Sequence, residues 1–203
     1  MFTRIGAPLL TAMMAGAFLQ LTAQTPSRST AEPAHPRYTA DNRLEFPADY
    51  REWVFLSAGR GMTYGSSANR NGPPLFDNVF VNPSAYREFL KTGYWPDKTM
   101  FALEVRSAAT EGSINRGGQF QKHLIAVEVE VKDQQRFSET EGWAYFGFGD
   151  GNKPASQIPK TQDCYDCHSK NAATEHTFVQ FYPTLIEIAK AHKNFREDAV
   201  SGR

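Results

Sequence analysis

The feature that most constrains this chain is the pentapeptide CYDCH at residues 164–168, which contains both cysteines of the 203-residue sequence. Two thiols three positions apart and followed by a histidine form the C-x-x-C-H attachment motif of a c-type haem. We expect Cys164 and Cys167 to bind haem c covalently and His168 to bind its iron as an axial metal ligand. The fold must then enclose a flat aromatic macrocycle.

Other interpretations of the two thiols explain less of the motif. A zinc site requires two more Cys or His ligands at motif spacing, and the sequence has no second cysteine pair. A redox dithiol is expected within a βαβ pattern and gives the adjacent histidine no role. A disulfide across two intervening residues is strained. Haem attachment in turn requires an oxidising compartment.

The N-terminus predicts export to such a compartment. Arg4 supplies a positive charge, residues 5–21 carry no charge and are rich in Ala, Leu and Met, and Ala23 offers a small residue for cleavage. This is the pattern of a secretory signal peptide over residues 1–23, and it predicts a periplasmic or secreted protein. A membrane anchor is the alternative, but Gly, Pro and Gln interrupt the apolar run, so no stable membrane span is expected after cleavage.

The rest of the chain reads as a single domain. We expect a flexible leader over residues 24–40, a haem domain over residues 41–195 and a disordered tail over residues 196–203. The 22 basic and 22 acidic residues balance, so no nucleic acid or anionic membrane partner is expected.

Hydrophobic periodicity and turn residues predict an α+β fold: an antiparallel β-sheet flanked by helices, with covalent haem packed against the sheet. The three later strands are spaced as a meander. The predicted helices are 47–56, 84–91 (capped by Asn82, with Pro83 first and Gly93 after its end) and 181–192, and the predicted strands are 78–81, 99–106, 122–131 and 143–148.

Two strands carry candidate site residues. In the strand 99–106, Phe101 and Leu103 lie on one apolar face, which is either a wall for haem or ordinary core. In the strand 122–131, valines alternate with Glu128 and Glu130, and this pattern places both glutamates on a solvated face.

Taken together, the spaced sequence motifs resemble those of the cytochrome P460 and cytochrome c′-beta family. The resemblance runs from residue 47 to about residue 190. It is carried by YREWV (50–54), VFVNP (79–83), KTG (91–93), Glu128, VKD (131–133), RF (136–137), WAY (143–145), CYDCH (164–168), NA (171–172) and FYP (181–183).

The resemblance implies a periplasmic β-sheet cytochrome, usually a homodimer, with five-coordinate haem held by His168 and a distal side open to small molecules such as nitric oxide. P460 members carry an additional bond from a lysine to the porphyrin and oxidise hydroxylamine. The c′-beta members lack that bond and bind diatomic gases in an apolar pocket.

The lysine position separates these two types. Leu103 occupies it here and has no nucleophile, and Lys98 is expected to point to the opposite face. The position of the distal arginine found in some members holds Asp77. The chain is therefore more similar to the c′-beta type.

Glu128 matches the second-sphere carboxylate of the family, which is thought to relay protons, and is the candidate catalytic residue. Phe76, Phe80 and Phe101 are candidates for an apolar distal cap that favours small uncharged ligands. Spare methionines and histidines are candidates for a sixth ligand, but no methionine lies in a recognisable ligand motif, His176 is expected on a helix near the surface and His192 is expected to pack. The candidates are Met62, Met100, His123, His176 and His192.

The sequence therefore predicts a haem protein that binds small gases, nitric oxide first, with one-electron redox, a redox partner protein and a homodimeric state. Two alternatives stay open. The first is a haem enzyme that oxidises hydroxylamine or nitric oxide with Glu128 as proton acceptor. The second is a six-coordinate electron-transfer cytochrome.

Overall fold

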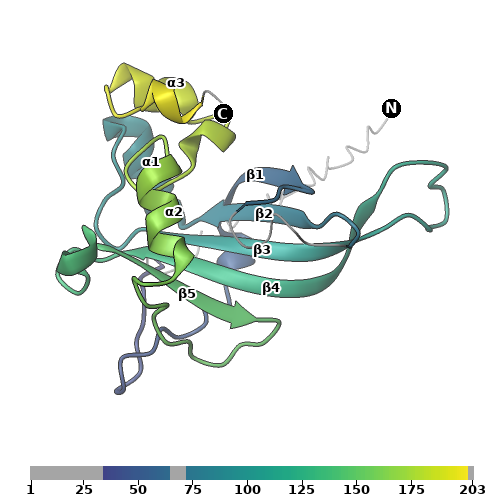
Figure 1. The fold of residues 1–203 in the computed structure, drawn as a ribbon, viewed down its shortest axis with the longest axis horizontal. Helices are drawn as coiled ribbons and strands as arrows, with labels where there is room; N and C mark the ends of the chain where they lie inside the picture. Colours follow the sequence, from purple (N-terminus) through teal and green to yellow (C-terminus); the bar gives the residue numbers. More distant parts are fainter. Residues whose placement is uncertain (1–33, 65–71, 201–203) are drawn as a thin grey trace, which may run out of the picture. The chain divides into compact units, whose positions relative to one another are not determined.

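The computed structural model describes residues 34–64 and 72–200, so the predicted signal peptide and most of the leader lie outside the described residues. The described strands form one antiparallel sheet in the order β1-β2-β3-β4-β5 (Figure 1). This arrangement confirms the α+β class and the meander of the later strands. The strands are β1 (Val54–Arg60), β2 (Phe76–Val81), β3 (Met100–Ala109), β4 (Phe120–Lys132) and β5 (Trp143–Gly149).

Three α-helices accompany the sheet: α1 (Pro83–Thr92), α2 (Asp163–Asn171) and α3 (Ile186–Ala191). Among the described residues, no helix has the length and apolar character needed to cross a membrane. Gly93 ends α1 in the left-handed region at φ 72°, as its position after the helix predicted.

Asn82 precedes α1, but its side chain does not cap the helix. Its Oδ1 accepts a hydrogen bond from the backbone N–H of Met100 at 2.9 Å, and its Nδ2 donates to the carbonyl of Ala34 at 3.0 Å. The buried amide therefore ties the start of β3 to the N-terminal segment instead.

The predicted helix over residues 47–56 is wrong. Only a single 3-10 turn forms, at Tyr50–Glu52, and the chain then enters β1 at Val54. Val54 pairs with Val81 and Phe55 with Phe80 on β2. Cross-strand pairing of these β-branched and aromatic side chains outweighs the helical spacing of the apolar residues before them.

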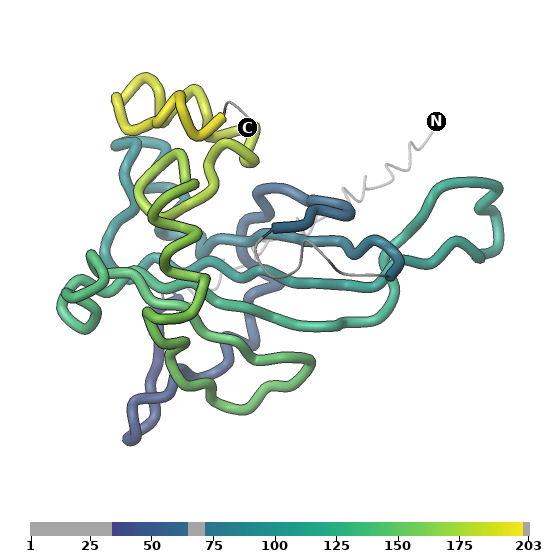
Figure 2. The backbone as a smooth tube through the Cα atoms, viewed as in Figure 1, coloured from purple at the N-terminus to yellow at the C-terminus, as the bar shows by residue number. Residues whose placement is uncertain are grey.

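Each face of the sheet carries its own core. The N-terminal face, which bears Met100, Ala102 and Val129, packs against residues 34–53. The helical face, which bears Val81 and Phe101, packs against α1, α3 and residues 178–182. Figure 2 shows the connection between β3 and β4 extending beyond the ends of the neighbouring strands.

The packed part of the chain is wider than the predicted range 41–195. The ring of Tyr38 contacts Phe137 and Phe146, both at 6.4 Å between centroids. At the other end, the backbone N–H of Arg196 donates to the carbonyl of Ala173 at 2.7 Å. Part of the expected flexible leader therefore belongs to the N-terminal face.

Candidate functional site

The C-x-x-C-H motif lies on α2, which packs against β5. Cys164 and Cys167 are both free thiols and both half-buried, and their three-residue spacing puts them on one side of the helix. Burial, together with the nearby negative charge of Glu128, raises the pKa of the Cys164 thiol. The Cys164 thiol is therefore held protonated beside the sheet.

The imidazole of His168 is held in one orientation by a backbone carbonyl of another residue and by two aromatic rings. Its Nδ1 lies 2.7 Å from the carbonyl oxygen of His176, and a carbonyl can only accept a hydrogen bond. Its ring lies 4.5 Å between centroids from Tyr145 and also from Phe178. Because Nδ1 carries the donated proton, Nε2 keeps the lone pair that a metal bond requires.

Glu130 lies beside this imidazole and is buried, so its predicted solvated position is wrong. The residue is 9% exposed, and its Oε1 lies 3.5 Å from Nδ1 of His168. The alternation of β4 is as predicted, but the helical face is covered at Glu130 and open at Glu128. Burial opposes charge on His168, yet Glu130 and the His176 carbonyl outweigh it, so the pKa of His168 is raised.

The structure brings Leu103 and Glu128 to this same face. Leu103 pairs with Glu128, and Glu128 in turn pairs with Gly147 across the sheet. Leu103 is half-buried and Glu128 is exposed. A Cβ added at Gly147 would meet only the Cδ1 of Ile158, at 3.9 Å, so the sheet offers open room beside the glutamate.

The three phenylalanines that are candidates for a distal cap do not lie together in the structure. Phe101 lies on the helical face, but it is only 3% exposed. Its ring centroid lies 4.8 Å from that of Trp95, and both residues belong to the core of that face. Phe80 packs against the core of the N-terminal face. Phe76 follows the same two-residue alternation of β2, so both point away from His168. The structure therefore does not bring Phe76 and Phe80 to the haem motif.

Lys98 does not substitute for a lysine at the Leu103 position. It precedes β3 in a left-handed conformation, with φ 65°, and its Nζ pairs with Asp133 at 2.6 Å. Met100 is buried in the core of the N-terminal face, on the opposite side of the sheet from His168.

His176 was expected near the surface on a helix, and that expectation is wrong. It is 3% exposed in the loop before residue 179, and its Nε2 lies 3.2 Å from Oε2 of Glu141. The contribution of His176 to the site is its backbone carbonyl, which no pattern in the sequence indicates. His123 is exposed at the start of β4, and His192 is exposed where α3 ends.

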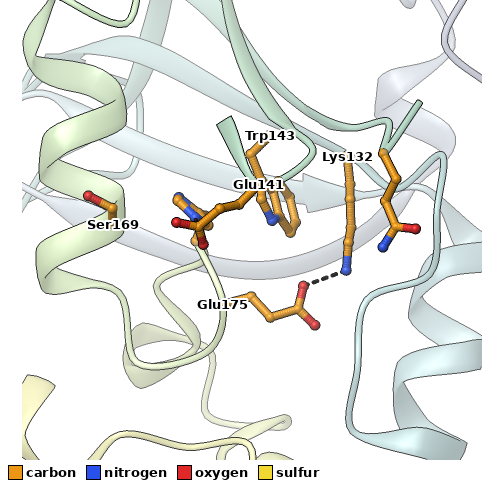
Figure 3. Close-up of a pocket in the computed structure, with 7 residues that line it drawn as sticks. Lys132, Glu141, Trp143, Ser169 and Glu175 are labelled. Atoms are coloured by element: carbon orange, nitrogen blue, oxygen red, sulfur yellow. Dashed lines mark hydrogen bonds and ion pairs between the residues drawn. The ribbon is translucent and has the colours of Figure 1, made fainter. Parts of the chain in front are cut away.

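A polar cleft of about 290 Å³ flanks α2 on the side of His176 (Figure 3). The ammonium of Lys132 is paired there with Glu175 at 2.7 Å and also donates to the carbonyl of Trp95. The charged side chains that line this cleft therefore form ion pairs with one another. The lining residues are Lys132, Gln134, Glu141, Trp143, Ser169, Glu175 and His176.

The residues around α2 fit the haem that the motif predicts. Two free thiols lie on one side of a helix, and the following imidazole is oriented so that Nε2 is the nitrogen that could ligate iron. Apolar Leu103 and the open backbone at Gly147 lie on the adjoining face. Among the described residues, no three His, Cys, Asp or Glu side chains gather as a protein-only metal site.

Comparison with known proteins agrees with this chemistry. A family model, Cytochrome P460, matches residues 47–179, which is more than half of the 203-residue chain. No curated protein matches the sequence. The matched range includes four segments that position the motif: β3, β4, β5 and α2.

Proposed function

The chain belongs to the cytochrome P460 family, and from this premise we propose that it is an exported c-type haem protein that binds small gases, nitric oxide first. Family membership implies a haem cofactor. Cys164 and Cys167 hold it through thioether bonds, and His168 binds its iron through Nε2. When bound, the haem supplies one-electron redox and a coordination position open to a small ligand.

The observation that carries this proposal is the contact between Nδ1 of His168 and the carbonyl of His176, at 2.7 Å. This hydrogen bond selects the tautomer in which Nε2 accepts a metal, and metal-binding histidines almost always make such a bond. A histidine with only a packing role would not need this orientation next to two free thiols.

Leu103 supports the gas-binding type over the cross-linked type. It lies on the helical face at the position where the P460 members carry a lysine, and Lys98 is engaged with Asp133. Within the family pattern, no lysine is left at that position to bond a porphyrin edge. The apolar side chain instead favours an uncharged ligand.

Optical spectra of the purified protein test this proposal. We expect high-spin ferric haem with ordinary c-type bands, and a ferrous spectrum that changes on addition of nitric oxide or carbon monoxide. A strongly red-shifted ferrous band would indicate a lysine bond and contradict the assignment of Leu103. A low-spin reduced spectrum that carbon monoxide does not change would favour six-coordinate electron transfer.

One observation favours a second function, oxidation of hydroxylamine or nitric oxide. Glu128 is exposed on the same face as Leu103, and its charge raises the pKa of the nearby Cys164. A carboxylate in that place is suited to accept a proton from a substrate. Turnover of hydroxylamine with an acceptor dye, abolished in Glu128→Ala, would support this enzyme. Its absence would leave gas binding as the function.

The cellular setting completes the proposal. The signal-like residues 1–23 support export to the periplasm, where haem attachment takes place. We also propose a homodimer and a redox partner protein, because family resemblance implies the first and one-electron chemistry requires the second. Fractionation of the producing cells tests the location, and sedimentation of the purified protein tests the dimer.

A further inference from the structure

Glu130 is a buried carboxylate beside His168 that the proposed function leaves unused. Its Oε1 has no hydrogen-bond partner, although the residue is only 9% exposed. Most buried polar atoms in proteins have a partner, and an incompletely compensated buried charge destabilises the fold. Such a group invites a functional explanation.

Among the neighbours of Glu130, His168 is the group that can balance its negative charge. Tyr145 on β5 and Phe101 on β3 are its neighbours in the sheet register. Burial and then the charge of Glu130 raise the pKa of Tyr145, and the same two causes raise the pKa of Tyr182, so both phenols lie near this carboxylate. Among the ion pairs of the described residues, Glu130 is paired with His168, at 3.5 Å.

The proton on Nδ1 of His168 thus faces two acceptors. The carbonyl of His176 lies at 2.7 Å and the Oε1 of Glu130 at 3.5 Å. The first is neutral and fixes the ring, whereas the second is a carboxylate held in a low-dielectric environment. A carboxylate on the second nitrogen of a metal-binding histidine raises the basicity of the first.

We propose, on the basis of the proposed haem function, that Glu130 is a positioning residue that acts through His168. Its charge, 3.5 Å from Nδ1, polarises the N–H group that the His176 carbonyl accepts, strengthens the bond from Nε2 to iron and lowers the reduction potential. The reason is electrostatic: a fixed negative charge in a poorly screened site stabilises ferric over ferrous iron. Tyr145 is the cross-strand neighbour of Glu130 and is itself buried.

The test compares the haem-loaded protein with its Glu130→Gln variant, which keeps the shape and removes the charge. At the midpoint potential of the unaltered protein, we expect the ferric-to-ferrous ratio to fall about tenfold, which is 59 mV for a one-electron couple. The iron–histidine stretching frequency of the ferrous variant, measured by resonance Raman spectroscopy, should also fall.

Glu187→Gln is the matched control, because it removes the same charge from an exposed position on α3. We expect a smaller shift of the ferric-to-ferrous ratio and an unchanged stretching frequency. Glu130→Asp, which restores the charge, should recover part of both effects. Equal shifts in the two glutamine variants, or an unchanged stretch in Glu130→Gln, would overturn the inference.

The unaltered protein provides a test that needs no variant. Its ferrous stretching frequency should lie with those of haem proteins whose proximal histidine donates to a carboxylate. A frequency typical of a histidine bound only to a backbone carbonyl overturns the role of Glu130 and leaves the proposed function standing. A protein without covalent haem overturns the proposed function itself.

Discussion

The two faces of the sheet each bury a glutamate, and the two are treated in opposite ways. On the N-terminal face, Glu104 is 1% exposed and accepts a hydrogen bond from the Tyr50 hydroxyl at 2.6 Å. It also pairs with Arg51 at 2.9 Å and with Arg106 at 3.2 Å. On the helical face, Glu130 keeps an oxygen without a hydrogen bond.

This difference indicates what each face is for. A buried carboxylate with two guanidinium partners and a tyrosine is fully compensated and holds strands together. A buried carboxylate with an incomplete set of partners costs stability and is expected where a charge acts on chemistry. The N-terminal face therefore supports the fold, and the helical face supports the site.

The largest expected effect is the loss of Glu104. In Glu104→Ala the exposed side chain of Arg51 and the partly buried side chain of Arg106 lose their buried carboxylate, and the Tyr50 hydroxyl loses its acceptor. Breaking a buried network of this kind costs about 3–5 kcal/mol. Urea unfolding followed by circular dichroism measures this loss. A loss below about 1 kcal/mol, the range of exposed ion pairs, would show that this cluster does not hold the face together.

Tyr50→Phe is expected to have the next largest effect. It removes the hydroxyl that donates to Glu104 at 2.6 Å, and a hydrogen bond to a charged group contributes about 1.5–3 kcal/mol. Burial and that hydrogen bond raise the pKa of Tyr50 to about 12. Titration of tyrosine absorbance checks the donor role directly, since a Tyr50 that ionises near pH 10 would contradict it.

Glu130→Gln should behave in the opposite way to Glu104→Ala. Removing a poorly compensated buried charge is expected to change the free energy of unfolding by less than about 1 kcal/mol or to increase it. The same urea experiment on the haem-loaded variant measures this. A loss as large as that of Glu104→Ala would mean that both glutamates serve the fold and would remove the contrast between the faces.

The smallest effect concerns acid stability at Asp133, near the ends of β3 and β4. Despite burial, its hydrogen bonds with Lys98 and the backbone of Arg136 hold its pKa below the ordinary value of 3.8. A lower folded pKa stabilises the fold above the unfolded pKa, and this stability is lost as pH falls through the folded value. Asp133→Asn should cost up to about 1 kcal/mol at pH 7 and nothing below the folded pKa. Unfolding curves at several pH values check this, and an equal loss at acid pH would contradict it.

The sequence predicted the parts of this molecule that local chemistry dictates. The C-x-x-C-H motif needs only its own spacing, and the alternation of residues 122–131 is strong enough to identify β4. The turn at Gly93 was predictable because few other residues adopt its backbone conformation. The resemblance singles out Leu103 and Glu128 separately, and only the register of β3 and β4 pairs them.

The rest depended on contacts between distant segments. The spacing of Tyr50 and Trp53 predicts a helix, and only the pairing with β2 makes the following residues a strand. Glu130 alternates like a surface residue, and only the elements covering the helical face bury it. The carbonyl of His176 bears no signal in the sequence, because any residue in that loop supplies one.

The central claim is that haem is bound covalently to Cys164 and Cys167. Mass spectrometry of the denatured, exported protein tests it most directly, combined with alkylation of free thiols. The account predicts a mass increase of one haem, retained colour after denaturation and two thiols that resist alkylation. A colourless protein with both cysteines alkylated would contradict it.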